Sequence, residues 1–132
     1  MNKNLSRILV FAEKMHLEIL SKDATEALIV VQDEKRGIYN LVIDCEDPIL
    51  VMEQLIYKVE TPSENHYKRL LQMNRSLVHG AFVLDEEAKH VLFRDTLQIE
   101  NLDFNEFEGT VNALSLGLAE FAHEIIELNK KG

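Results

Sequence analysis

The spacing of the apolar residues changes along this chain between a helical period and a strand period, and these changes constrain the fold more than any single motif. Leu5, Ile8, Ala12 and Met15 recur at helical spacing, which predicts a first helix that ends near Met15 or His16. The next stretches, "HLEIL", "EALIVVQD" and "GIYNLVID", are short and β-rich, and "DEKRG" supplies a turn between the last two. We therefore expect three antiparallel strands after the first helix.

The stretch "ILVMEQLIYKV" predicts a further strand, because apolar residues alternate along one face from Ile49 to Val59. Glu53 is the exception on that face. The interruption indicates a break or a β-bulge near Glu53 and Gln54, which fits the pattern better than a helix does.

The sequence "TPSE" is typical of a helix start, with Thr61 as the N-cap, Pro62 at the first helical position and Glu64 three residues after the cap. A second helix is therefore expected to begin at Pro62, and Gly80 ends its period. One face of this helix is apolar with a single polar exception, and it carries Tyr67, Leu70, Leu71, Asn74 and Leu77.

Two elements are expected beyond Gly80. The stretches "AFVLD" and "HVLFRDTL" flank the turn "DEEAK" and predict a second hairpin. Asp103 and Glu106 repeat the capping pattern and predict the start of a long C-terminal helix. The apolar stripe of that helix comprises Phe107, Val111, Leu114, Leu118, Phe121, Ile125 and Leu128.

The order of these elements is α-β-β-β-(β)-α-β-β-α. Runs of strands bracketed by helices imply an α+β fold, in which helices cover one face of a mostly antiparallel sheet of about five strands. At 132 residues the chain has the length of one domain, and we expect residues 1–132 to form it without disulfides or metal ions.

The formal net charge of −9, from 23 acidic and 14 basic residues, argues against nucleic acid and anionic membranes as partners. It suits a soluble protein or one that meets a basic partner segment. The N-terminal apolar run "ILVFA" does not have the features of a signal peptide, and no stretch approaches the ~18 apolar residues of a membrane helix. The single Cys45 lies among acidic residues that disfavour the thiolate. We therefore expect an inert thiol and a cytoplasmic protein.

Residue types that catalyse reactions or bind metals occur singly in this sequence. The histidines lack metal-ligand spacing, the glycines form no phosphate-binding loop, and Ser115 falls within a helix rather than on a nucleophile turn. Asp85, Glu86 and Glu87 lie at a hairpin tip, where solvent disfavours the raised pKa of a general acid. We therefore expect no catalytic residue, no metal site and no cofactor.

Two polar residues near the end of the second helix need a structural explanation. His79 is expected to cap the helix, because the last carbonyl groups lack partners and the helix dipole favours a cation there. Asn74 lies on an otherwise apolar stripe. It either satisfies nearby backbone groups or marks a face shared with another chain, where an amide can fix the register.

Residues 70–103, "LLQMNRSLVHGAFVLDEEAKHVLFRDTLQIENLD", together with the apolar helix that follows, resemble the second half of the type III secretion chaperone-like fold of CesT-type chaperones and YbjN-like proteins. This resemblance implies an acidic cytoplasmic homodimer that binds a polypeptide segment of a partner protein and catalyses nothing. The matching positions are Leu70, Leu71, Asn74, Gly80, Asp85, Leu92, Leu97 and Leu102.

Two functions are compatible with these patterns. The first is a chaperone-like protein-binding module, which is favoured by apolar residues on both faces of "ALIVV" and "PILVM". The second is a small-ligand-binding or enzymatic domain that uses His79 or His90 with a neighbouring carboxylate. For the first function, the expected dimer or partner interface is Tyr67, Leu70, Leu71, Asn74 and Leu77.

Overall fold

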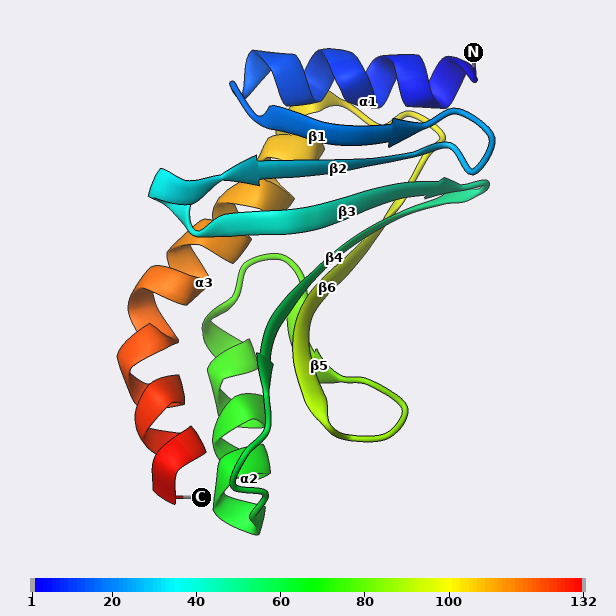
Figure 1. Cartoon of the computed structure of the whole chain (residues 1–132). Helices are drawn as coiled ribbons and strands as arrows, with labels where there is room; N and C mark the ends of the chain where they lie inside the picture. Colours follow the sequence, from blue (N-terminus) through cyan, green and yellow to red (C-terminus); the bar gives the residue numbers. More distant parts are fainter. Residues whose placement is uncertain (1, 132) are drawn as a thin grey trace.

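The computed structural model describes residues 2–131 as three helices and two short 3-10 helices around an antiparallel sheet of six strands (Figure 1). The strand order β1-β2-β3-β4-β6-β5 confirms the expected α+β class, with six strands where about five were expected. In chain order the elements are α1 (Lys3–Lys14), β1 (Glu18–Asp23), β2 (Leu28–Asp33), η1 (Glu34–Arg36), β3 (Ile38–Glu46), β4 (Ile49–Lys58), α2 (Glu64–Met73), η2 (Asn74–Ser76), β5 (Ala81–Leu84), β6 (His90–Gln98) and α3 (Phe104–Lys131).

The first of two clusters of buried side chains lies between the sheet and two helices, α1 and the first half of α3. Both helices contribute to this one cluster, so they cover the same face of the sheet. We call the cluster the main core. Its buried residues are Leu5, Ile8, Ala12, Met15, Leu17, Ile29, Val31, Ile38, Leu41, Ile43, Leu50, Met52, Phe93, Ile99, Leu102, Phe107, Val111, Ala113 and Leu114.

The second cluster lies at the other end of the molecule, where α2 runs beside the C-terminal half of α3 (Figure 1). The expected stripe of α3 supplies part of both clusters, so the long amphipathic helix joins them. We call the second cluster the C-terminal core. Its buried residues are Val59, Leu70, Met73, Phe82, Val91, Phe121, Ile125 and Leu128.

The start of α2 differs from the expectation. The N-cap is Ser63, whose Oγ accepts a hydrogen bond from the backbone N–H of His66 at 3.0 Å, and the helix begins at Glu64. Thr61 instead donates its hydroxyl to the carbonyl oxygen of Asn129 at 2.7 Å. The predicted Thr61 cap is therefore wrong, because a contact with the distant end of α3 uses that side chain.

The strand predicted from Ile49 is present as β4, but its irregularity lies elsewhere. The register with β6 shifts between Leu55 and Tyr57, not at Glu53 and Gln54. Gln54 is buried without a break, because its side-chain oxygen accepts from the N–H of Tyr39 at 3.0 Å and its amide donates to the carbonyl of Gly37 at 3.1 Å. These two hydrogen bonds satisfy a polar side chain on the covered face of the sheet.

The second hairpin and the cap of α3 are confirmed. β5 and β6 pair in antiparallel register across the turn, and Asp103 accepts a hydrogen bond from the N–H of Glu106 at 2.8 Å. α3 then continues for 28 residues to Lys131.

Candidate functional site

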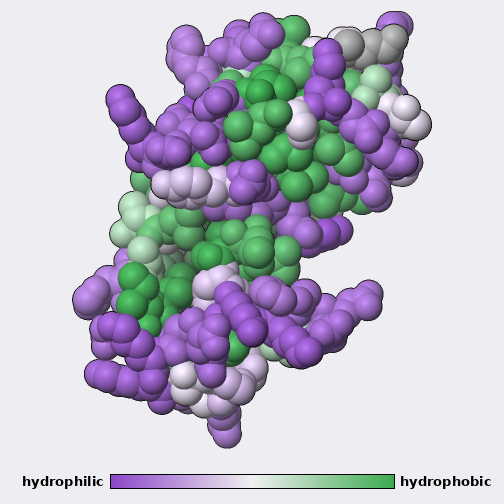
Figure 2. Space-filling view, in the orientation of Figure 1, coloured by the Kyte–Doolittle hydropathy of each residue, from purple (hydrophilic) through white to green (hydrophobic). Residues whose placement is uncertain are grey.

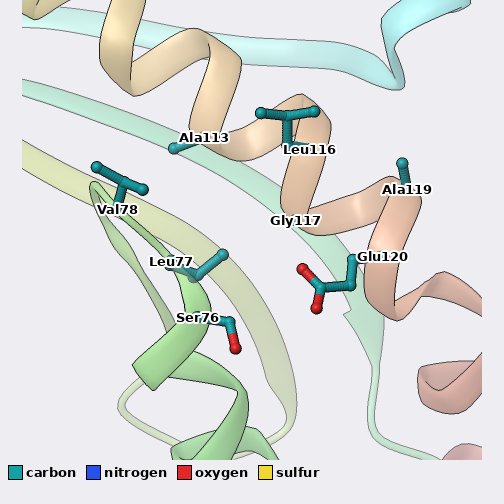
Figure 3. Close-up of a pocket in the computed structure, with 8 residues that line it drawn as sticks. All are labelled: Ser76, Leu77, Val78, Ala113, Leu116, Gly117, Ala119 and Glu120. Atoms are coloured by element: carbon teal, nitrogen blue, oxygen red, sulfur yellow. The ribbon is translucent and has the colours of Figure 1, made fainter.

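A groove runs between α3 and the segment that follows η2, at the junction of the two cores. Two aliphatic side chains at its rim are largely exposed: Val78 at 85% and Leu116 at 70%. The depression has a volume of about 500 Å³. Its lining, shown in Figure 3, is Ser76, Leu77, Val78, Ala113, Leu116, Gly117, Ala119 and Glu120.

The segment that follows η2 packs closely against α3. Leu77 points toward Gly117, where a Cβ atom would lie only 2.7 Å from a methyl carbon of Leu77 (Figure 3). About two turns earlier on α3, a Cβ atom at Gly109 would lie 2.9 Å from Nε2 of His79. Each of these two glycines of α3 therefore leaves room for one side chain of the segment.

Two further contacts fix the end of the segment. Asn74 accepts from the N–H of Phe82 at 2.8 Å and donates to its carbonyl at 3.2 Å, so its amide joins the end of α2 to β5. Gly80 has a φ of +71°, and a Cβ atom there would lie 2.4 Å from the ring of Phe93. A side chain at position 80 would therefore be excluded both by the backbone conformation and by the ring.

The predicted role of His79 as a helix cap is wrong. α2 ends at Met73 and the 3-10 turn after it ends at Ser76, so His79 lies beyond the last helical carbonyl groups. Its ring packs against Gly109 instead. Within residues 2–131 no hydrogen bond connects this ring to a carboxylate, so the expected pairing with a neighbouring carboxylate is not seen at His79.

The five residues of the predicted interface divide into an inner and an outer group. Leu70 is buried in the C-terminal core, and Asn74 and Leu77 support the groove from below. Leu71 is 71% exposed, and with the half-buried Tyr67 it lines a second, shallow hollow on α2. Leu70 and Leu71 both lie within α2, and neighbouring residues of a helix point about 100° apart, so one faces the core and the other faces solvent.

The other candidate for chemistry, His90, pairs with a carboxylate of its own hairpin. Its Nδ1 lies 2.7 Å from Oδ2 of Asp85, and this hydrogen bond lowers the pKa of Asp85. Both side chains are about one-third exposed. The pair therefore bridges the ends of β5 and β6 at a hairpin and is separate from the surroundings of His79.

Two further groups that could be reactive, the thiol of Cys45 and the imidazole of His66, are buried or engaged in contacts within the fold. Burial, followed by the charge of Asp44, raises the pKa of the Cys45 thiol to about 11, so the thiol stays protonated at neutral pH. His66 is fully buried, and its ring lies 2.7 Å from the hydroxyl of Tyr57 and 3.1 Å from the carbonyl oxygen of Thr61. The part of the chain that the structure describes contains no cluster of three or more histidine, cysteine or acidic side chains that could hold a metal ion.

One residue of the groove, Leu116, can be recognised from the sequence pattern. Leu116 lies between Leu114 and Leu118 but falls off the buried stripe of α3, so it had to be either exposed or in contact with another chain. Val78 gave no comparable signal, because no regular period describes the segment after η2.

These features define an α+β protein with an uncovered apolar groove. The CesT_Tir_1 family model matches residues 1–131, and the chain belongs to this family. No curated protein matches the sequence. None of the helices within residues 2–131 has the length and apolar character needed to span a bilayer.

Solved structures share the fold at low sequence identity. YbjN from E. coli aligns with a TM-score of 0.69 and 13% identity, covering 91% of this chain and 92% of YbjN. A chain of the ExsC–ExsE complex aligns with a TM-score of 0.60 and 20% identity, covering 89% and 92%. The Yersinia pestis type III secretion chaperone SycH, solved with a stable fragment of YscM2, aligns with a TM-score of 0.55 and 16% identity, covering 96% and 99%. The resemblance expected from residues 70–103 is therefore confirmed over the whole fold.

Proposed function

We propose that this protein is a cytoplasmic, non-catalytic module that binds a polypeptide segment of another protein. The observation that carries the proposal is the pair of uncovered apolar surfaces, namely the groove and the hollow around Leu71. Exposed aliphatic side chains gathered beside a well-packed core are typical of protein-interaction sites. Membership of the CesT_Tir_1 family supports the proposal, as does the likeness to SycH, whose structure contains a fragment of a second protein.

We further propose that the protein acts as a homodimer through the outer surface of α2. Leu71 and Tyr67 supply the contact, while Leu70, Asn74 and Leu77 hold α2 and the adjoining segment in place from beneath. Leu71 is the large hydrophobic side chain of α2 that is most exposed, and burying it against a second copy would remove its apolar surface from water. Glu64, Lys68 and Arg75 border the same hollow, so its rim carries charges of both signs.

The substitution Leu71→Glu tests the dimer, because it puts a charge in the centre of the proposed contact without touching either core. We expect wild-type protein to have the mass of two copies by light scattering and the variant to have the mass of one. Val10→Glu on α1 is the matched control, since Val10 is also exposed and lies outside the hollow. A Leu71→Glu protein with unchanged mass and unchanged thermal stability would exclude this interface.

We also propose that the protein catalyses no reaction, because its candidate side chains have other roles. The histidine–carboxylate pair at the second hairpin is partly exposed and joins adjacent strand ends, which is a structural role. Cys45 is protonated at neutral pH, and the amide of Asn74 is used within the fold. These side chains therefore have structural roles that do not require a substrate.

A further inference from the structure

One face of the sheet carries apolar side chains although no helix of the described chain packs on it. α1 and α3 both cover the opposite face, and Figure 1 shows α3 behind strands β1 to β3. Strand pairing places the following residues together on the uncovered side, which we call the outer sheet face: Leu28, Val30, Val42, Asp44 and Val51.

The centre of the outer sheet face is aliphatic. Val30 on β2 pairs directly with Val42 on β3. Two residues further along β3, Asp44 pairs with Leu28 on one side and with Val51 on the other. Val51 is only 8% exposed, yet it belongs to neither core, so neighbouring side chains of the sheet surround it. Figure 2, in the same orientation as Figure 1, shows hydrophobic residues gathered over these strands and bordered by hydrophilic ones.

At the edge of this apolar centre, the carboxylates of Glu46 and Glu26 disfavour the charged form of Asp44. Burial raises the pKa of Asp44, and the hydrogen bond and charge of Glu46 and then the charge of Glu26 raise it further. Within residues 2–131 none of the three forms a salt bridge. On the same side of the sheet Glu53 is paired with Arg94, so the unneutralised charge is concentrated at the Asp44 end.

We propose that the outer sheet face binds a basic polypeptide segment that carries aliphatic side chains. This inference rests on the proposed function and specifies the chemistry of the partner. Aliphatic side chains of the segment would cover Val30, Val42 and the edge of Leu28, while a lysine or arginine would enter the space between Asp44, Glu46 and Glu26. The cation would relieve a repulsion that the isolated protein contains.

Other occupants fit this face less well. A second copy would bring another chain with a net charge of −9 against this acidic edge. Nucleic acid and anionic lipid would meet the same repulsion. A basic segment is the occupant whose charge complements the edge and whose side chains complement the centre.

The test is a methyl NMR titration of the full chain with an eight-residue peptide of alternating valine and lysine, blocked at both ends. We expect shifts at the methyl groups of Leu28, Val30, Val42 and Val51. The matching serine–lysine peptide should bind at least several-fold more weakly because it lacks aliphatic groups, and the valine–glutamate peptide should produce no shifts at this face.

A charge variant separates local recognition from general attraction to an acidic protein. The double substitution Asp44→Asn with Glu46→Gln should weaken binding of the valine–lysine peptide about tenfold, the loss expected for two partly exposed charge contacts. Glu86→Gln with Glu87→Gln removes the same charge from the second hairpin and should leave the affinity unchanged. The first variant removes a repulsion, so it should fold normally, and its methyl spectrum reports this directly.

Three results would overturn the inference. These are shifts at Val78 and Leu116 instead of the outer sheet face, equal losses in the two charge variants, or no shift with any of the peptides. Shifts confined to the groove would leave the proposed protein-binding function intact and move the site. The proposed function itself is tested separately, by whether the protein retains a polypeptide partner from its own cells.

Discussion

The main core and the C-terminal core are stabilised in different ways. The main core contains 19 buried residues, all apolar, drawn from two helices and five strands or the loops beside them, whereas the C-terminal core contains eight. Hydrogen bonds between distant segments occur around both clusters, but around the smaller one they stand beside fewer buried apolar residues. Asn129 alone accepts from the N–H of Glu60 at 2.7 Å and donates to the carbonyl of Lys58 at 3.0 Å.

This contrast teaches that polar contacts take a larger share of the stabilisation where fewer apolar residues are buried. Arg69 on α2 makes two hydrogen bonds to Glu124 on α3, at 2.5 and 2.8 Å, and His66 is enclosed beneath the same helix. Small groups of apolar residues provide less burial free energy, so directional contacts take a larger share in fixing the geometry. The three predictions that follow test this difference.

The largest effect is expected from opening a cavity in the main core. Phe107→Ala removes a fully buried ring that lies 5.6 Å from the ring of Phe11, and it should lower the free energy of unfolding by ~3–5 kcal/mol. Phe121→Ala, the same deletion in the C-terminal core, should have a smaller effect because that ring is less completely buried. Urea denaturation of both variants checks the order, and an equal or larger loss for Phe121→Ala would contradict the comparison.

A smaller but more local effect is expected from removing the buried imidazole. His66→Phe puts a slightly larger, apolar ring in place of the imidazole and leaves the hydroxyl of Tyr57 and the carbonyl of Thr61 without their partner, which should cost ~1–3 kcal/mol. Hydrogen exchange should accelerate in α2 before it does in the strands of the main core.

His123→Phe is the control for this substitution, because His123 is exposed on α3. It should change neither stability nor exchange. Uniform acceleration throughout the sheet in His66→Phe would show that the two cores do not respond separately.

The smallest effect concerns the ion pair between α2 and α3. The hydrogen bonds from Arg69 lower the pKa of Glu124 below its usual value of 4.5, so the carboxylate favours the folded state above that pH. This stabilisation is lost as the pH falls through the lowered pKa. Because both side chains are more than one-third exposed, the contribution is small and should weaken further in salt.

Thermal unfolding between pH 6 and pH 3 checks the sign. Glu124→Gln should lack the part of the acid destabilisation that this pair causes in wild-type protein. An identical pH dependence in the two proteins would show that the contact contributes nothing measurable.

The sequence predicted the elements of the main core better than those of the C-terminal core, for a physical reason. Burial on one face of a helix or strand leaves a period, and that period located α1, β2, β3 and α3. The role of Thr61 depends on Asn129, 68 residues away, and no local pattern contains that contact. The break expected near Glu53 and Gln54 was wrong for the same reason, because the partners of the buried Gln54 are Gly37 and Tyr39 at the start of β3.

The candidate site was predicted in part. Apolar residues on both faces of "ALIVV" and "PILVM" indicated an uncovered surface, and Val30 and Val51 lie on the outer sheet face. Asn74 has the local role that was one of its two interpretations, through its bonds to Phe82. The groove was missed because α3 and the segment around Val78 form it together, and the contact between them depends on single glycines whose packing leaves no periodic signal.

The central claim is that this protein holds a polypeptide of another protein as a dimer. The most direct test is native mass spectrometry of tagged protein captured from its own cell extract at moderate salt. The account predicts a mass equal to two copies plus a stoichiometric polypeptide, and loss of the two-copy species when Leu71→Glu is captured in the same way. A single copy with no bound polypeptide in the wild-type sample would contradict it.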